Sequence, residues 1–385
     1  MKYINEFRDP DSVKNILAQI HKSTKQAWNI MEVCGGQTHT IVKYQLIKLL
    51  PDKINLIHGP GCPVCVTPEA TLDEAILISK IPNVIMTSFG DMLRVPSQYG
   101  SLLQARANGS DIKIVYSPLD AIQIAINNPD KEIVFLSIGF ETTTAPNALA
   151  VLQAASLGLK NFSVLVSQVR VPPAIEAIIN TDNSKIDGFL AAGHVCTVMG
   201  IEEYRPLVAK YNRPIVVTGF EPMDILLGLF KVIKQLESGF ASIDIEYSRS
   251  VIETGNLIAK KAIEKVFKIA DQSWRGLGVI PQSGYILRNE YLNYDARNKF
   301  IKKQILNNNN HDNQAKTIYQ FLNPLNKVSS SLKFQSECGE ILKGIKKPPQ
   351  CTHFGKNCKP DLPLGAPMVS TEGACAAYYN YLSIY

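Results

Sequence analysis

Short apolar runs rich in β-branched residues recur along the first 270 residues, and each is followed by a glycine or polar turn and a helical pattern. Eight of these runs are predicted strands, namely Trp28–Val33, Ile54–His58, Val84–Ser88, Ile112–Ser117, Ile133–Ile138, Ser163–Ser167, Gly188–Ala192 and Ile215–Thr218. The amphipathic segments between them include Pro68–Lys80, Asp120–Ile126, Pro146–Ala155 and Pro173–Ile179. Nearly continuous apolar strands that alternate with helices indicate buried parallel sheets, so the pattern predicts an α/β fold with doubly wound parallel sheets.

One short segment occurs twice and supports two such sheets. The stretches 133–142 and 214–222 each carry Gly-Phe-Glu directly after a predicted strand. Because Gly-Phe-Glu also makes a good strand-to-helix turn by itself, chance recurrence stays an open alternative. With two α/β units, we predict a first domain at 1–140 and a second at 141–270.

The pattern changes after Lys260. A glycine-rich stretch, 274–281, is followed by a polar connector that begins at Asn307–Asn310 and continues to about Ser331. From Ser336 onward the chain is dense in cysteine, glycine and proline and has little periodicity. Such a segment has too few apolar side chains for a core and needs a covalent or metal staple. We therefore predict a small irregular C-terminal domain at 271–385.

Composition narrows the possible functions. The sequence is 45% hydrophobic and 19% charged, as expected for a globular protein without extensive disorder. No window has the roughly eighteen uninterrupted apolar residues of a membrane span. The N-terminus has no secretory signal, which predicts a cytoplasmic protein. A formal net charge of +6 is spread thinly over 385 residues, so neither a membrane nor a nucleic-acid partner is expected.

The eight cysteines are distributed unevenly. Three lie early, one is isolated in the middle, and four lie near the end of the chain: Cys34, Cys62 and Cys65; Cys196; and Cys338, Cys351, Cys358 and Cys375. In a reducing cytosol, clustered thiols bind metal or perform redox chemistry more often than they form structural disulfides. Two separate thiol sites are therefore predicted, whereas Cys196 is expected to pack as a small apolar residue.

The early cysteines lie in two glycine-containing motifs that each follow a predicted strand. Cys34 begins Cys-Gly-Gly-Gln-Thr-His-Thr, in which His39 is a candidate base, proton carrier or ligand. Cys62 and Cys65 have C-x-x-C spacing, which permits either a tight disulfide or chelation of one metal ion. Structural zinc would require a second pair nearby. A redox-active dithiol beside a third reactive thiol is therefore the favoured interpretation.

The four late cysteines have the spacing C-x12-C-x6-C-x16-C. This spacing matches neither a zinc ribbon nor the ferredoxin motifs. Four thiolates nevertheless satisfy the ligand requirement of a [4Fe–4S] cluster, and structural zinc remains the alternative.

Other polar side chains also follow predicted strands. They are Asp91, Arg94, Glu141, Arg170, His194, Glu221 and Asp224. Each by itself is more typical of a helix cap or a turn. Together they predict one crevice lined by carboxylates, guanidinium groups and imidazole.

Four sequence blocks together resemble the HypD family of [NiFe]-hydrogenase maturation scaffolds. They are Met-Glu-Val-Cys-Gly-Gly at 31–36, Gly-Pro-Gly-Cys-Pro-Val-Cys at 59–65, Cys-Thr-His-Phe-Gly at 351–355 and Ser-Thr-Glu-Gly-Ala-Cys-Ala-Ala-Tyr at 370–378. The resemblance extends from about Cys34 to the C-terminus. It implies two α/β domains with a cleft between them and a C-terminal iron–sulfur domain. It also implies assembly of the Fe(CN)2CO unit with the chaperone HypC, with cyano groups delivered by HypE.

The resemblance also implies roles for individual cysteines. Cys34 would bind the iron of the transient Fe(CN)2CO unit, shared with a cysteine of HypC. Cys62 and Cys65 would form the redox dithiol. The [4Fe–4S] cluster would be held by the late quartet, namely Cys338, Cys351, Cys358 and Cys375.

Two positions depart from the family pattern. Gln37 stands where many members have histidine, which puts a metal or proton role at that position in doubt, whereas His39 remains. Pro367 occupies a place where some members carry another cysteine, so Cys375 is left as the fourth cluster ligand.

Our sequence hypothesis is one electron path from the cluster through the Cys62/Cys65 pair to iron at Cys34. A stand-alone iron–sulfur thiol-disulfide oxidoreductase is the alternative, although it leaves Cys34 and its glycines unexplained. A zinc-stapled interaction protein is a third possibility.

Overall fold

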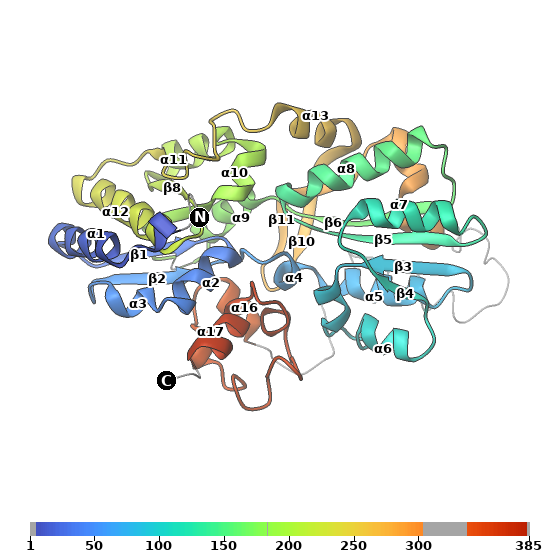
Figure 1. Ribbon diagram of the computed structural model, residues 1–385, viewed down its shortest axis with the longest axis horizontal. Helices are drawn as coiled ribbons and strands as arrows, with labels where there is room; N and C mark the ends of the chain where they lie inside the picture. Colours follow the sequence, from blue (N-terminus) through green and yellow to red (C-terminus); the bar gives the residue numbers. More distant parts are fainter. Residues whose placement is uncertain (1–4, 183, 303–336, 383–385) are drawn as a thin grey trace.

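The computed structural model describes residues 5–182, 184–302 and 337–382, which contain two parallel β-sheets (Figure 1). Sheet A has the strand order β2-β1-β7-β8-β9. Its strands are β1 (Trp28–Glu32), β2 (Ile54–His58), β7 (Gly188–Ala192), β8 (Ile215–Thr218) and β9 (Ile243–Ile245). Sheet B has the order β4-β3-β5-β6. Its strands are β3 (Val84–Ser88), β4 (Ile112–Ile114), β5 (Glu132–Gly139) and β6 (Phe162–Gln168). The predicted α/β class with two parallel sheets is confirmed.

All eight predicted strands are present, four of them with the predicted bounds. The others differ by three residues or fewer at an end, most in β4, an edge strand with only three residues. Sequence analysis missed β9, the other edge of sheet A, because it is short and only partly buried.

Helices connect successive strands and cover both sheets. Those up to the end of sheet A are α1 (Pro10–Ser23), α2 (Gly35–Lys43), α3 (Leu46–Leu49), α4 (Pro63–Val66), α5 (Glu69–Ser79), α6 (Leu102–Ala107), α7 (Pro118–Asn127), α8 (Glu141–Ser156), α9 (Val171–Ile179), α10 (Gly193–Met199), α11 (Arg205–Tyr211) and α12 (Pro222–Ser238). The four amphipathic segments predicted as helices correspond to α5, α7, α8 and α9. Among the described residues, none of the helices has the length and apolar character needed to span a bilayer.

Each sheet has its own apolar core beneath its helices. In sheet A, Ile20 of α1 and Leu229 of α12 pack with Ile30 and Val216, and all four side chains are buried. Burying one such side chain stabilises the fold by about 1.5–3 kcal/mol. In sheet B, α7 and α8 contribute to a second core with β5 and β6. A third cluster lies between the sheets and contains residues of both.

An antiparallel hairpin joins sheet B to the region of α4. It consists of β10 (Phe267–Trp274) and β11 (Gly278–Leu287), and α13 (Leu257–Val266) directly precedes it in the chain. The hairpin turn corresponds to the glycine-rich stretch noted in the sequence. Beyond the turn, β11 accepts a hydrogen bond from the N–H of Arg170 at the Ser283 carbonyl (2.8 Å). At the turn, the N–H of Arg275 donates to the Val66 carbonyl (2.8 Å).

The C-terminal residues 337–382 contain little regular structure. Their elements are α16 (Cys338–Leu342), η6 (Pro348–Gln350), η7 (Ala366–Met368) and α17 (Ala374–Leu382). Helix α17 packs against α2, far from it in sequence (Figure 1). The polar connector at 307–331 lies outside the described residues.

The sheets do not follow the predicted domain limits. Strands β1 and β2 precede residue 140, yet they form sheet A with β7, β8 and β9. Strands β5 and β6 lie on opposite sides of that limit and pair with each other in sheet B. The hairpin likewise crosses the limit at residue 270. The chain therefore passes from sheet A to sheet B and back, while the limits 1–140, 141–270 and 271–385 themselves stay a prediction.

A buried carboxyl group lies where α8 begins. Glu141 is 1% exposed, and its Oε1 accepts the N–H of Val171, the first residue of α9, at 2.9 Å. Burial disfavours the charged carboxylate and raises the pKa of Glu141 to about 7. The carboxyl group therefore joins two helices of the sheet B region and holds a proton near neutral pH.

This proton makes stability depend on pH. Because the pKa of Glu141 is higher in the folded state than its usual value, its contribution is complete below about pH 4.5 and is lost as pH rises through 7. The unfolding free energy of the wild type should fall by about 3 kcal/mol more than that of Glu141→Gln between pH 4.5 and 8, because glutamine cannot ionise. Urea unfolding across this range measures it. The exposed Glu69→Gln change is the control, and an unchanged slope in Glu141→Gln contradicts the prediction.

Candidate functional site

Cys34 lies in the turn between β1 and α2, at the carboxyl end of a parallel strand. Its carbonyl oxygen accepts the N–H of Gln37 at 2.9 Å, at the start of α2. The loop after the neighbouring strand β2 packs directly on this turn, because the N–H of Gly35 donates to the Gly61 carbonyl at 3.1 Å. A Cβ atom at Gly61 would overlap the backbone of Cys34, so only glycine fits there. The two early cysteine motifs therefore meet at one edge of sheet A.

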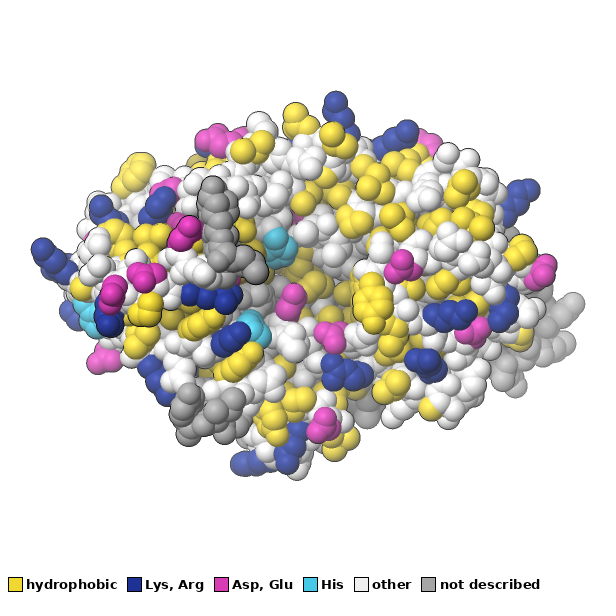
Figure 2. All heavy atoms as spheres, viewed as in Figure 1, with side chains coloured by type: hydrophobic (Ala, Val, Ile, Leu, Met, Phe, Trp, Pro, Cys, Tyr) yellow, Lys and Arg dark blue, Asp and Glu magenta, His cyan; other side chains and the backbone are white. Residues whose placement is uncertain are grey.

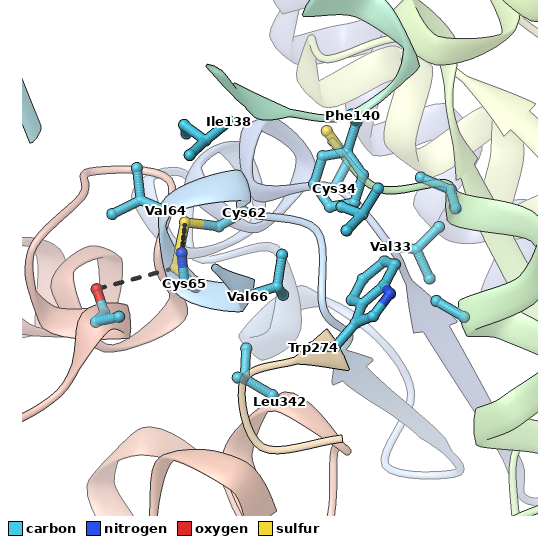
Figure 3. Close-up of a cluster of buried hydrophobic side chains, with 14 of the residues drawn as sticks. Val33, Cys34, Cys62, Val64, Cys65, Val66, Ile138, Phe140, Trp274 and Leu342 are labelled. Atoms are coloured by element: carbon cyan, nitrogen blue, oxygen red, sulfur yellow. Dashed lines mark hydrogen bonds between the residues drawn. A yellow bond between two sulfur atoms is a disulfide. The ribbon is translucent and has the colours of Figure 1, made fainter. Parts of the chain in front are cut away.

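Cys62 and Cys65 are joined by a disulfide at the N-terminus of α4 (Figure 3). Their Cα atoms are 5.2 Å apart, and the Cys62 Sγ accepts the Cys65 N–H at 3.2 Å. Both side chains are buried, with Cys62 4% and Cys65 0% exposed. The C-x-x-C pair therefore forms the tight disulfide that its spacing permits, inside the cluster between the two sheets.

The Cys34 thiol is also buried, at 4% exposure, and belongs to the same apolar cluster as the disulfide (Figure 3). Burial, and then the nearby carboxylate of Glu372, raise the pKa of Cys34 above its usual value. The Sγ lies 3.7 Å from Nδ1 of His194, whose pKa burial lowers to about 4. At neutral pH the pair is therefore an uncharged thiol beside an uncharged imidazole that can accept its proton.

The two Gly-Phe-Glu segments contribute to the surroundings of Cys34. Phe140, after β5, is buried in the cluster that contains Cys34 (Figure 3). Phe220, after β8, packs against this cluster. A Cβ atom at Gly36 would lie 3.0 Å from the Phe220 ring and 3.8 Å from the Cys34 Sγ. Both segments form strand-to-helix turns, and each presents a phenylalanine to the region between the sheets.

His39 and Gln37 point to different parts of the structure. The His39 ring packs edge-on against Tyr381 of α17, with Nε2 3.2 Å from the tyrosine hydroxyl. Within the described contacts, the imidazole next to Cys34 is that of His194, and the chemical role of His39 stays a prediction. Gln37 is fully buried, and its Nε2 donates to the Ala191 carbonyl and the Thr218 hydroxyl. It joins α2 to β7 and β8.

The four late cysteines come together in residues 337–382. Cys358 and Cys375 are buried in one small apolar cluster, and Cys351 packs against it. Burial raises the pKa of Cys375, and the neighbouring Cys338, Cys358 and Cys351 thiols raise it further. Among the described residues, none of the four forms a disulfide. The Cys358 Sγ accepts the N–H of Leu364 at 3.4 Å, and Gly365 lies against the Cys338 Sγ where a Cβ atom would overlap it.

One backbone segment contacts both the late cysteine quartet and the Cys62–Cys65 disulfide. Gly365 lies against Cys338, and the carbonyl of the next residue, Ala366, lies 4.0 Å from the Cys65 Sγ (Figure 3). On the other side of the disulfide, the backbone of Gly61 packs on Cys34. Short stretches of packed main chain therefore separate Cys34, the Cys62–Cys65 disulfide and the late quartet.

The single crevice proposed for the other polar residues that follow strands stays a prediction. Most have local partners, which are the Arg94–Asp91, Arg170–Glu203, Arg8–Glu221 and Arg249–Asp224 ion pairs and the Glu141 contact with Val171. Of the predicted group, His194 is the member next to Cys34. Figure 2 shows a shallow hollow near the centre of the drawn face, where histidine and acidic side chains are visible. Helix capping and ion pairing therefore explain most of these residues.

Sequence reasoning did not identify the residues that hold the Cys34 backbone. The Cys34 N–H donates to Oε2 of Glu32 at 2.9 Å, and Glu32 is 0% exposed. The other carboxylate oxygen of Glu32 accepts Nδ1–H of His58 at 2.6 Å. A glutamate as the last residue of an otherwise apolar strand was the available signal, because a buried charge needs partners.

Comparison with known proteins places the chain in a family. The profile of the HypD family, described as the hydrogenase formation hypA family, matches residues 11–382. The hydrogenase maturation factor HypD of Azotobacter vinelandii is 42% identical over 391 residues, covering 99% of this chain and 97% of the relative. HypD of Rhodobacter capsulatus is 43% identical (99% and 98% covered), and that of Escherichia coli K12 is 39% identical (99% and 98% covered). The chain belongs to the HypD family and has a role in hydrogenase maturation.

Proposed function

We propose that this chain, with the chaperone HypC, assembles the Fe(CN)2CO unit of [NiFe]-hydrogenase from cyanide delivered by HypE. Cys34 binds the iron together with a cysteine of HypC, and the Cys62/Cys65 pair is the redox dithiol. The main support for this proposal is backbone packing. Gly61 packs on Cys34, and the segment Gly365–Ala366 contacts both Cys338 and Cys65. This packing brings the three thiol groups within reach of one electron path.

The late quartet fits a [4Fe–4S] cluster. Its four thiols influence one another electrostatically, and glycine lies against the Cys338 sulfur while a backbone N–H donates to the Cys358 sulfur. Among the described residues, no group of three or more histidine, cysteine or acidic side chains is arranged for a single metal ion. Four thiolates are the ligand set of a [4Fe–4S] cluster, and this donor set carries the assignment, with structural zinc as the alternative. Such a cluster, held by Cys338, Cys351, Cys358 and Cys375, supplies electrons.

The Cys62–Cys65 disulfide is suited to exchange electrons in pairs. Its reduction consumes two electrons and two protons and yields two thiols. In the disulfide form the Cys65 sulfur faces the Ala366 carbonyl at 4.0 Å, and after reduction the Cys65 S–H donates to the same oxygen. The buried site therefore offers a partner to the reduced pair and keeps external thiols away from it.

The surroundings of Cys34 suit a soft iron that carries cyanide and carbon monoxide. Binding of iron requires the thiolate, so the Cys34 proton must leave, and Nδ1 of His194, 3.7 Å away, is a hydrogen-bond partner for the sulfur. Phe140 and Phe220 make the region apolar, which shields the bound unit from water. Since Cys34 is 4% exposed, iron reaches it only when the surrounding side chains move.

The alternative function, a stand-alone thiol-disulfide oxidoreductase, is less well supported by the burial of the pair. A protein disulfide must approach one sulfur in line to exchange with it. With Cys62 at 4% and Cys65 at 0% exposure, a folded substrate has no access to either sulfur.

Cys65→Ala tests the electron path. We expect this variant to retain the visible absorption of the cluster and to lose iron loading at Cys34, because the remaining Cys62 thiol has no partner for two-electron exchange. Iron bound per protein, after anaerobic purification with HypC, measures loading. Cys196→Ala is the matched control, since it removes another buried thiol. Undiminished loading in Cys65→Ala contradicts the path.

Turnover of an external disulfide separates the two functions. We expect the reduced protein alone to reduce insulin disulfides at the rate of its Cys62→Ala/Cys65→Ala variant, because both sulfurs are buried. Absorbance at increasing insulin concentration measures the rate. Catalytic turnover without HypC, lost in the double variant, would support the oxidoreductase instead.

A further inference from the structure

Two tyrosine–histidine pairs fasten helix α17 to the region of Cys34. The Tyr378 hydroxyl lies 2.9 Å from Nε2 of His58, and the Tyr381 hydroxyl lies 3.2 Å from Nε2 of His39. Both ring pairs are edge-on, with centroids 5.3 and 5.1 Å apart. The two tyrosines are three residues apart and therefore share one face of α17. This helix also carries Cys375 of the late quartet.

Of these two pairs, the one at Tyr378 continues through further hydrogen bonds to Cys34. On its other side, His58 lies with Nδ1 2.6 Å from Oε1 of Glu32. The second oxygen of the same carboxylate accepts the Cys34 N–H at 2.9 Å. The Thr38 hydroxyl, one turn into α2, also donates to Glu32. One chain of hydrogen bonds thus connects the helix of Cys375 to the main chain of Cys34.

The hydrogen-bond directions in this chain are consistent from end to end. The Glu32 carboxylate only accepts, so His58 donates from Nδ1. With Nδ1 protonated in a neutral imidazole, Nε2 accepts, and Tyr378 donates its hydroxyl proton. Glu32, His58 and Tyr378 are 0%, 5% and 5% exposed. Because an unpartnered buried polar group is costly, loss of one member affects the next.

We propose that Tyr378, His58 and Glu32 are positioning residues that hold the Cys34 turn in register with the cluster-bearing helix α17. The assignment of the two thiol centres in this statement rests on the proposed function. A displacement of α17 changes the Tyr378–His58 contact, then the orientation of the Glu32 carboxylate, and finally the restraint on the Cys34 N–H. The chain thereby couples the geometry of one thiol centre to that of the other.

The pair Tyr381–His39 provides a matched control. It comes from the same face of α17 and has a similar ring geometry, but among the described contacts His39 makes no hydrogen bond to Glu32. If α17 acted only as a docked helix, removal of either hydroxyl would have the same effect on Cys34. If the hydrogen-bond chain positions Cys34, removal of the Tyr378 hydroxyl has the larger effect.

The rate of Cys34 alkylation tests the proposal. The full chain, purified anaerobically, is treated with iodoacetamide, and peptide mass spectrometry follows modification at Cys34. We expect Tyr378→Phe and His58→Leu to raise the rate roughly three- to tenfold, because a restraint on a buried turn is lost. Tyr381→Phe should stay within about twofold of the wild type. His58→Asn keeps an amide N–H near the Nδ1 position for Glu32 but has no acceptor for Tyr378, so its rate should match that of Tyr378→Phe.

Three results overturn the proposal: wild-type rates in both Tyr378→Phe and His58→Leu, equal acceleration by Tyr381→Phe and Tyr378→Phe, or a wild-type rate in His58→Asn. Tyr378→Phe retains the ring and keeps the test valid should His58→Leu fold poorly. Visible absorption per chain is compared among the variants, so that loss of the C-terminal segment is detected. Because alkylation requires neither iron nor cyanide, failure of the proposed function is recognised separately, by absence of iron at Cys34 in the wild type.

Discussion

Close backbone packing at glycine residues holds the thiol-bearing segments of this protein together. A Cβ atom at Gly35 would overlap Glu372, one at Gly61 would overlap Cys34, and one at Gly365 would overlap the Cys338 sulfur. Each of these glycines permits a main-chain approach that a larger side chain prevents. The approach brings three distant parts of the chain into contact at the carboxyl edge of sheet A. The proposed electron path depends on that contact, because no single segment of the chain provides all of the thiols that it uses.

Burial gives this site its chemical character. A thiol in water near its ordinary pKa is partly ionised and reacts readily with disulfides. Desolvation raises the pKa of Cys34 and keeps it protonated beside the Cys62–Cys65 disulfide, so premature exchange between them is suppressed. In the proposed function, an arriving iron would supply the positive charge that stabilises the thiolate. The same burial limits access, and loading of the site therefore requires local movement.

The sequence predicted the strands well, because buried parallel strands are continuous runs of β-branched residues, as in 133–138. It also predicted that Cys34 would lie near the C-x-x-C pair, because both motifs follow strands whose carboxyl ends share one edge. It did not reveal that β1 pairs with β7, since that contact joins segments far apart in sequence. For the same reason the contact of His58 with Tyr378, 320 residues away, had no local signal. The ion pair of Asp224 with Arg249, 25 residues away in the chain, likewise had no local signal.

The central claim is that Cys34 binds iron carrying cyanide and carbon monoxide, and infrared spectroscopy tests it most directly. The protein is purified anaerobically together with HypC, and a parallel preparation carries Cys34→Ala. The account predicts cyanide and carbonyl stretching bands in the first sample and their loss in the second. Bands of equal intensity in both samples, or no bands in the native complex, would contradict it.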